Sequence, residues 1–211
     1  MKQSAVIAQL LSRYPLISDQ ISRPALATVL TQLDLTLQRA IEGDVVELGC
    51  YIGTTTLFLR RLLDTTNQSD TSRIFAYDSF TGLPPKTNAD ASGTGEQFQG
   101  GELSVTKKQF LHEFYKANLK PPITIKGWFN DLTPEQLPET IAFAFLDGDF
   151  YASILDSLRL VWPRLAVGGV ITIDDYQREA LPGVERAVRD FFQGKAIELH
   201  HEHHIAVIRR R

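Results

Sequence analysis

Four aspartates follow two apolar segments in the second half of the chain. Asp147 and Asp149 come directly after one segment, and Asp174 and Asp175 come directly after the next. Carboxylates crowded in this way are costly unless a cation neutralises them. Oxygen-only ligands favour Mg²⁺, Mn²⁺ or Ca²⁺ over zinc. Such an ion could lower the pKa of a substrate oxygen, and an unligated aspartate could take its proton as a general base. The alternative is that these aspartates cap the helices that follow.

A second candidate site is a glycine-containing turn, Glu47–Gly53, with the sequence ELGCYIG. Glycines there allow close approach of a ligand, and the amino end of the following helix offers free N–H groups. The acid Glu47 suits a cationic or amino-bearing ligand better than a pyrophosphate. Asp78 ends the next apolar segment, where a carboxylate can accept hydrogen bonds from ribose hydroxyls. The pattern indicates a nucleoside-type ligand, with a plain strand–helix turn as the structural alternative.

Apolar segments and amphipathic segments alternate along most of the chain. We expect a doubly wound, Rossmann-like α/β fold with a mostly parallel sheet, whose ligands sit beyond the carboxyl ends of the strands. The last two segments predict an antiparallel C-terminal hairpin, which makes the sheet seven-stranded. The expected strands are 45–48, 73–78, 123–126, 141–146, 170–173, 196–199 and 205–209, and the expected helices are 23–41, 54–63, 105–118, 153–163 and 184–192.

Composition limits the classes of protein that the chain can represent. A length of 211 residues suits one domain, 1–211, with an N-terminal helical segment at 1–42. A net charge of −3 argues against a nucleic-acid partner. The single cysteine, Cys50, suits a reducing compartment. We find no pattern of a signal peptide or a membrane span, and therefore expect a cytoplasmic protein without a membrane partner.

Two further segments have unusual compositions. Segment 79–104 contains PPKTNADASGTG and few apolar residues, which predicts a mobile lid loop, with a disordered insertion as the alternative. Four histidines surround Glu202 in the predicted hairpin, near the edge where ligands would bind. One of them could contact a substrate or act as the base; a solvated hairpin tip is the alternative. These histidines are His200, His201, His203 and His204.

Several segments resemble one family over roughly residues 43–195. VVELGCYIGTTTLFL, FAYDSFTGLPP, IKGWFNDLTP, FLDGDFYASILDSLRLVWPRLAVGGVITIDDY and PGVERAVRDFF, in this order, resemble the macrocin O-methyltransferase (TylF-type) family. The spacing of Asp147, Asp174 and Asp175 is also similar to the metal ligands of catechol-type O-methyltransferases. The resemblance implies a class I methyltransferase fold that uses S-adenosylmethionine. It further implies O-methylation of a sugar or phenolic hydroxyl on a natural product, assisted by Mg²⁺ (or by Mn²⁺ or Ca²⁺). A homodimer is also expected.

The resemblance also assigns roles to individual residues. The metal ligands would be Asp147, Asp174 and Asp175, with Asp147 the leading general base and Asp149 the second candidate. The donor would be held by Glu47, Gly49, Tyr51, Gly53, Thr54, Asp78, Ser79, Phe129, Asn130 and Asp147. Two other functions remain open. An NAD-dependent oxidoreductase would prefer a Gly-x-Gly-x-x-Gly turn, which the chain lacks here, and a non-catalytic nucleoside-binding module would not need four aspartates.

Overall fold

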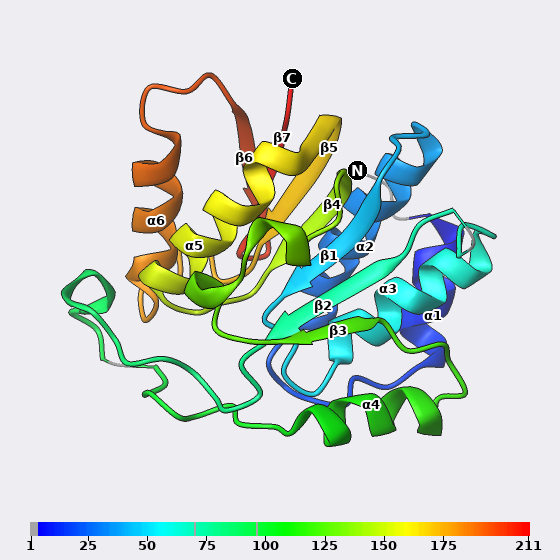
Figure 1. The fold of residues 1–211 in the computed structure, drawn as a ribbon, viewed down its shortest axis with the longest axis horizontal. Coiled ribbons are helices and arrows are strands. Elements are labelled where there is room, and N and C mark those ends of the chain that lie inside the picture. The colour runs from blue at the N-terminus through cyan, green and yellow to red at the C-terminus, as the bar shows by residue number, and fades with distance from the viewer. Residues whose placement is uncertain (1–3, 70, 96) are drawn as a thin grey trace.

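A seven-stranded sheet with the order β3-β2-β1-β4-β5-β7-β6 forms the centre of the computed structural model (Figure 1). The structure describes residues 4–69, 71–95 and 97–211, so a few residues of the predicted segments 1–42 and 79–104 lie outside it. Strands β1 to β5 are parallel, and β7 is antiparallel to both β5 and β6. The strands are β1 (Asp44–Leu48), β2 (Ile74–Asp78), β3 (Ile123–Lys126), β4 (Ile141–Leu146), β5 (Leu165–Ile173), β6 (Glu198–Glu202) and β7 (Ile205–Arg209).

This topology confirms the predicted doubly wound sheet with a C-terminal antiparallel hairpin. The chain builds β1, β2 and β3 outward in one direction and then returns to place β4 on the other side of β1. The point where the strand order reverses leaves a crevice at the carboxyl ends of β1 and β4. The turn after β1 and the aspartates after β4 and β5 therefore lie at one edge of the sheet.

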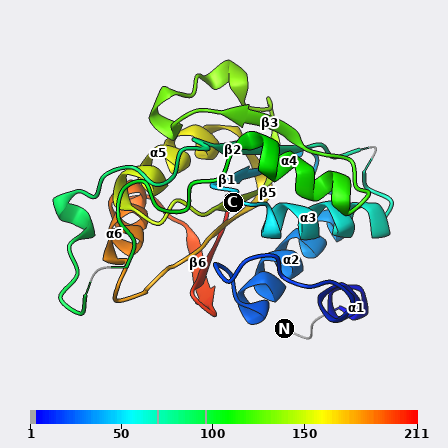
Figure 2. The same cartoon turned by 90° about the horizontal axis from the view of Figure 1, so that it is seen from below.

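Helices cover both faces of the sheet, which explains the nearly continuous apolar strands. Residues of α1, α2 and α3 pack with Val45, Phe143 and Phe145 on one face. Residues of α5 and α6 pack with Val46, Ala144 and Ile171 on the other face. Figure 2 shows the two groups of helices on opposite faces of the sheet. The helices are α1 (Ala5–Arg13), α2 (Arg23–Gln38), α3 (Thr54–Thr65), α4 (Lys107–Lys116), α5 (Tyr151–Val161) and α6 (Pro182–Phe192).

The C-terminal hairpin begins two residues later than the sequence predicts. Glu198 pairs with Arg209 and Glu202 pairs with Ile205, which leaves a two-residue turn. Both turn residues, His203 and His204, have left-handed backbones with φ of 53° and 65°. Such turns match the twist of the flanking strands and fix the register of the hairpin. The sequence predicts the hairpin and a short turn, but not that the turn has only two residues, because it contains neither glycine nor asparagine.

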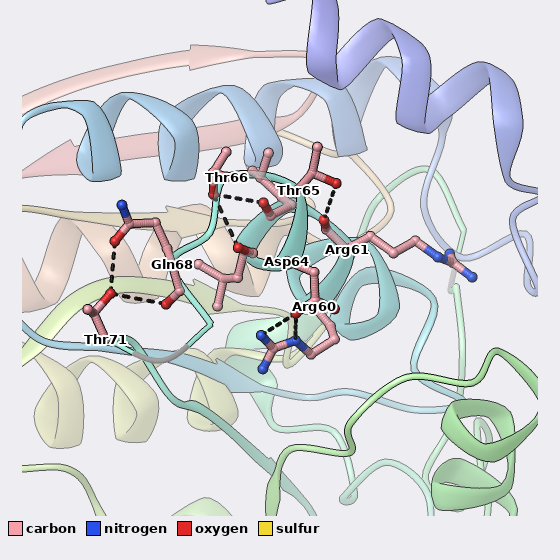
Figure 3. Close-up of polar contacts among 9 residues, drawn as sticks. Arg60, Arg61, Asp64, Thr65, Thr66, Gln68 and Thr71 are labelled. Carbon is pink, nitrogen blue, oxygen red and sulfur yellow. Dashed lines mark hydrogen bonds and ion pairs between the residues drawn. The ribbon is translucent and has the colours of Figure 1, made fainter.

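Polar contacts fix the carboxyl end of α3 (Figure 3). Arg60 pairs with Asp64 at 2.6 Å, one helical turn apart. The Thr66 hydroxyl donates to the Leu62 carbonyl at 2.8 Å, beside the main-chain bond from Thr66 N–H to the same carbonyl at 3.0 Å. These contacts lie at the end of the helix far from the Glu47–Gly53 turn. They stabilise the last turns of the helix whose amino end follows that turn.

Segment 79–104 joins β2 to α4 and contains one short 3₁₀ helix, η1 (Asn88–Asp90), among its described residues. Its two ends meet where Leu83 N–H donates to the Glu102 carbonyl at 2.9 Å and Gly101 N–H donates to the Leu83 carbonyl at 2.8 Å. The lid function of this segment stays a prediction. Among the described helices, none is both long enough and apolar enough to cross a membrane.

Candidate active site

A cavity of about 630 Å³ opens at the carboxyl ends of the five parallel strands. Each strand contributes a residue at or just beyond its end: Gly49, Asp78, Gly127, Asp147 and Asp175. Segment 79–104 and the connection between α1 and α2 complete the wall. The remaining lining residues are Asp19, Gln20, Tyr51, Ser79, Gly82, Leu83, Pro84, Pro85, Gln97, Phe98, Leu103, Trp128, Phe129, Asn130, Asp131, Gly148, Asp149, Ala152, Ser153, Asp156 and Arg178.

The glycines of the Glu47–Gly53 turn are required by two different close approaches. Gly49 has φ of 89°, and a Cβ there would lie 1.7 Å from the main-chain oxygen of Asp147. Gly53 has φ of 97° and forms the N-cap of α3, where a Cβ would lie 2.9 Å from the Phe110 ring of α4. A side chain at either position would therefore strain the backbone and displace a neighbour. These contacts press the turn against β4 and α4.

Asp78 fixes the same turn from the end of β2. Its Oδ2 accepts hydrogen bonds from the N–H groups of Cys50 at 3.0 Å and Tyr51 at 2.9 Å. Its Oδ1 accepts one from Phe80 N–H at 2.7 Å and retains a free lone pair. Burial raises the pKa of Asp78, and the three N–H donors oppose that rise. The half-buried carboxylate lines the cavity and can accept a further hydrogen bond from a ligand.

Glu47 lies beneath the turn rather than in the cavity wall. Its side chain is 1% exposed, and its Oε2 has no hydrogen-bond partner among the described residues. Burial raises the pKa of Glu47 to about 8. Gly53 and Thr54 also lie outside the wall, and the Thr54 hydroxyl is 2.7 Å from that of Ser18. The predicted donor residues that do line the cavity are Gly49, Tyr51, Asp78, Ser79, Phe129, Asn130 and Asp147.

Three carboxylates from the loops after β4 and β5 meet in the cavity wall. One oxygen from each of Asp147, Asp149 and Asp175 lies within 4.8 Å of the others. Asp149 and Asp175 both have left-handed backbones, with φ of 58° and 56°. Burial, and then the neighbouring carboxylates, raise the pKa values of Asp147 and Asp149. The Arg178 guanidinium pairs with Asp175 at 2.5 Å. The cluster is suited to binding a cation.

Asp174 lies next to this cluster but is not one of its three members. Its side chain is 4% exposed and does not line the cavity. Its Oδ1 accepts a hydrogen bond from Asp175 N–H at 2.9 Å. Burial, and then the charge of Asp175, raise the pKa of Asp174 to about 8. Of the predicted metal ligands, the structure thus brings Asp147 and Asp175 together, with Asp149 as the third carboxylate.

The capping alternative is not what the structure shows for these aspartates. Phe150 forms the N-cap of α5 and Leu181 that of α6, and neither helix has a side-chain hydrogen bond from its own N-cap residue. The four aspartates after β4 and β5 therefore do not have helix capping as their structural reason.

Sequence reasoning missed several residues that line the cavity. Asp19 and Gln20 come from the connection between α1 and α2, which no motif marks. Gln97 and Phe98 come from segment 79–104, whose composition does not show which of its residues face the cavity. Arg178 had a detectable signal, because it follows Asp175 by three residues and pairs with it.

The hairpin histidines lie near the cavity edge without lining it. His204 accepts a main-chain hydrogen bond from Tyr176 N–H at 2.8 Å, and its Nδ1 is 3.3 Å from the Tyr176 carbonyl. Nδ1 of His203 is 3.2 Å from the Thr28 hydroxyl of α2. The hairpin turn therefore supports the loop that carries Asp175. A role of these histidines as the base stays a prediction.

Comparison with known proteins places these features in context. The family described as Macrocin-O-methyltransferase (TylF) matches residues 18–208. The 8-demethyl-8-(2,3-dimethoxy-alpha-L-rhamnosyl)-tetracenomycin-C 4'-O-methyltransferase of Streptomyces olivaceus is 32% identical over 166 residues, which are 75% of this chain and 61% of that protein. Demethyldecarbamoylnovobiocin O-methyltransferase of Streptomyces niveus is 28% identical over 141 residues, 64% of this chain and 53% of that protein. The chain therefore spans less than two thirds of the length of these curated relatives.

Solved structures agree with the observed fold. The O-methyltransferase NovP superposes with a TM-score of 0.75 at 25% identity, over 88% of this chain and 78% of that one. The calicheamicin methyltransferase CalS11 superposes with a TM-score of 0.72 at 20% identity, over 96% of this chain and 89% of that one. The second likeness concerns the fold alone. Together they confirm the predicted methyltransferase-type Rossmann architecture.

Proposed function

The chain belongs to the macrocin O-methyltransferase (TylF) family, and from this premise we propose that it transfers a methyl group from S-adenosylmethionine to a hydroxyl of a small natural product. The acceptor hydroxyl would belong to a sugar or a phenol. One observation carries the proposal: a single cavity contains both the glycine turn with Asp78 and the three-carboxylate cluster. The first is suited to a nucleoside, and the second to a cation beside a reacting oxygen.

The charge of the cavity supports a cationic donor. Seven of the described lining residues are aspartates, and Arg178 is the one basic residue among them. A wall of this sign attracts the sulfonium and ammonium groups of S-adenosylmethionine and repels the pyrophosphate of NAD. The free lone pair of Asp78 would accept a ribose hydroxyl, while Phe129 and Asn130 would border the adenine. Glu47 would act from beneath the turn, near the methionine end.

The donor set of the carboxylate cluster fits a divalent ion. Oxygens within 4.8 Å of one another can share an ion at the usual metal–oxygen distances of roughly 2.0–2.6 Å. Asp147, Asp149 and Asp175 would hold Mg²⁺, or Mn²⁺ or Ca²⁺, while Asp174 stays a predicted ligand. When bound, the ion would lower the pKa of the acceptor hydroxyl. Arg178 would share Asp175 with the ion and so position that carboxylate.

The chain itself must supply a base for the acceptor proton. Asp147 is the first candidate and Asp149 the second, because both line the cavity, and the one that acts as the base would be the one whose carboxylate is not bound to the ion. The acceptor oxygen would form a bond to the methyl carbon as the carbon–sulfur bond breaks. The electron pair of that bond would go to sulfur, and the hydroxyl proton to the aspartate.

Three further properties belong to the same proposal. We expect small-molecule acceptors rather than nucleic acid, which agrees with the acidic cavity. We expect a cytoplasmic location, for which the buried free thiol of Cys50 is ordinary. We expect a homodimer, which light scattering of the purified protein would test.

The acceptor class can be tested directly by product analysis. The protein would be incubated with S-adenosylmethionine, Mg²⁺ and a panel of polyhydroxylated glycosides and phenols, and the products analysed by mass spectrometry. We expect at least one acceptor to gain one methyl group for each S-adenosylhomocysteine formed. Methylation of a nitrogen or carbon atom, with no oxygen product anywhere in the panel, would overturn the proposal.

A further inference from the structure

The amino end of α5 is capped by a residue from a distant segment. The N–H of Tyr151, the first residue of α5, donates to Oδ1 of Asp90 at 2.6 Å. Asp90 belongs to η1 in segment 79–104 and is only 3% exposed. Its Oδ2 accepts from the N–H and the hydroxyl of Thr87 at 2.8 and 2.7 Å. One buried carboxylate therefore joins this segment to the turn that contains Asp149.

The opposing helix leaves space for this carboxylate. A Cβ on Gly183 of α6 would lie 2.0 Å from Oδ1 of Asp90 and 2.8 Å from the nitrogen of Tyr151. Glycine at this position is required for space, since any side chain would displace the Asp90 carboxylate. Arg186, one turn later in α6, donates to the Ala89 carbonyl at 2.5 Å. The first turns of α5 and α6 thus form a pocket for η1.

Two other contacts connect segment 79–104 to the loops that carry the carboxylate cluster. The Lys86 ammonium lies 5.4 Å from the centre of the ring of Phe150, the residue that follows Asp149. The Ser92 hydroxyl donates to the Glu179 carbonyl at 2.7 Å, in the loop after β5. Figures 1 and 2 both show the segment running from β2 to the side of α6 and returning to α4. The segment is therefore docked on both acidic loops.

We propose that Asp90 is a positioning residue for the carboxylate cluster and for the wall of the cavity above it. Asp149 has a left-handed backbone, which costs a non-glycine residue free energy and must be held by its surroundings. The bond from Asp90 to Tyr151 fixes the chain two residues after Asp149. The same carboxylate seats segment 79–104, whose Pro84 and Pro85 line the cavity. The kinetic part of this inference rests on the proposed methyl transfer.

The experiment compares two ways of breaking this bond with a matched control. Asp90→Ala removes the acceptor, and Gly183→Ala displaces it without changing the charge. Asp190→Ala is the control, because Asp190 contacts the same Tyr151 only through the side-chain hydroxyl, at 3.2 Å. The readouts are Mn²⁺ affinity by electron paramagnetic resonance, S-adenosylhomocysteine affinity by calorimetry, and kcat.

We expect Asp90→Ala and Gly183→Ala each to weaken Mn²⁺ binding and lower kcat by about 10- to 100-fold, which is typical for residues that orient metal ligands. S-adenosylhomocysteine affinity should stay at the wild-type value, and the control should match the wild type in all three readouts. Asp90→Asn keeps one oxygen for Tyr151 N–H and should recover most of the Mn²⁺ affinity. If Asp90→Ala does not fold, Asp90→Asn and Gly183→Ala decide the question.

Two outcomes would overturn the inference. One is wild-type Mn²⁺ affinity and kcat in Gly183→Ala and Asp90→Asn as well as in Asp90→Ala. The other is an equal loss of Mn²⁺ and S-adenosylhomocysteine binding, which would assign Asp90 to general stability. A wild-type protein that binds Mn²⁺ but not S-adenosylhomocysteine would contradict the proposed function, while the Mn²⁺ readout would still test Asp90.

Discussion

The two sides of the cavity are held in opposite ways. On the donor side, the Asp78 carboxylate accepts three main-chain N–H groups, and two glycines press the turn against its neighbours. On the acidic side, oxygens of the buried Asp149 and Asp175 and of the half-buried Asp147 lie within 4.8 Å of one another, and Arg178 pairs with Asp175. Hydrogen bonds from within the chain therefore hold the Asp78 carboxylate, whereas the acidic cluster needs protons or a cation to offset its charge.

Because of this difference, we expect substitutions on the two sides to affect different measured properties. Changes to the acidic side should affect turnover and cation binding while donor affinity persists. Changes to the donor side should affect donor affinity first. Each experiment below tests whether the two sides can be separated in this way.

The largest expected effect is that of Asp147→Asn. The substitution removes the leading base and one carboxylate of the cluster without changing the side-chain volume. We expect kcat to fall by about 100- to 10,000-fold, the usual contribution of general acid–base catalysis. Product formation measured by mass spectrometry, with S-adenosylhomocysteine calorimetry as the control, checks this. A fully active variant would remove Asp147 from both roles.

The next effect is that of removing the divalent ion. Treatment with a chelator should lower turnover by about 100-fold, because a metal ion supplies several kcal/mol of charge stabilisation. Added Mg²⁺ should restore turnover, and S-adenosylhomocysteine affinity should not change in either condition. Turnover that is indifferent to the chelator would transfer the chemistry to an aspartate alone or to a hairpin histidine.

For Asp78→Asn we expect a smaller effect, on donor affinity rather than on turnover. The amide can accept hydrogen bonds at one end only, so either the N–H groups of Cys50 and Tyr51, or the N–H of Phe80 and the ribose hydroxyl, lose their acceptor. Since such a bond contributes about 1.5–3 kcal/mol, S-adenosylhomocysteine binding should weaken by roughly 10- to 150-fold. The kcat at saturating donor should stay close to the wild-type value. A fall in kcat with unchanged donor affinity would show that the two sides are not separable.

The smallest effect concerns stability and pH at Glu47. Its folded pKa of about 8 lies above the ordinary value of 4.5, so the native state binds the proton more tightly than the unfolded chain. The stability that this proton provides is present at low pH and is lost as the pH rises toward 8. The melting temperature of Glu47→Gln, relative to the wild type, should therefore be higher at pH 8 than at pH 5. A relative melting temperature that falls between pH 5 and pH 8 would contradict a pKa raised by burial of the Glu47 carboxyl.

Most of the fold could be predicted because its signals are local. The bounds of β3, β4 and β7 agree with the apolar runs, and the acids that end β2, β4 and β5 mark the ligand edge. The sequence could not show which carboxylates meet. The loops after β4 and β5 bring these carboxylates together, and the left-handed backbones of the non-glycine residues Asp149 and Asp175 leave no pattern in the sequence.

Other parts of the site depend on contacts between distant segments. Glu47 was expected to face the ligand, but its side chain lies under the turn, because all five residues of β1 are buried between two helical layers. Asp90 lies 61 residues before the helix that it caps, and Asp19 reaches the cavity from the connection after α1. Periodicity and spacing within one segment cannot reveal such contacts.

Calorimetry of the purified protein with S-adenosylhomocysteine and, separately, with NAD tests the central claim most directly. The acidic cavity, the glycine turn and Asp78 predict binding of S-adenosylhomocysteine in the micromolar range, and no binding of NAD. Binding of NAD without binding of S-adenosylhomocysteine would contradict the methyltransferase function and favour an oxidoreductase.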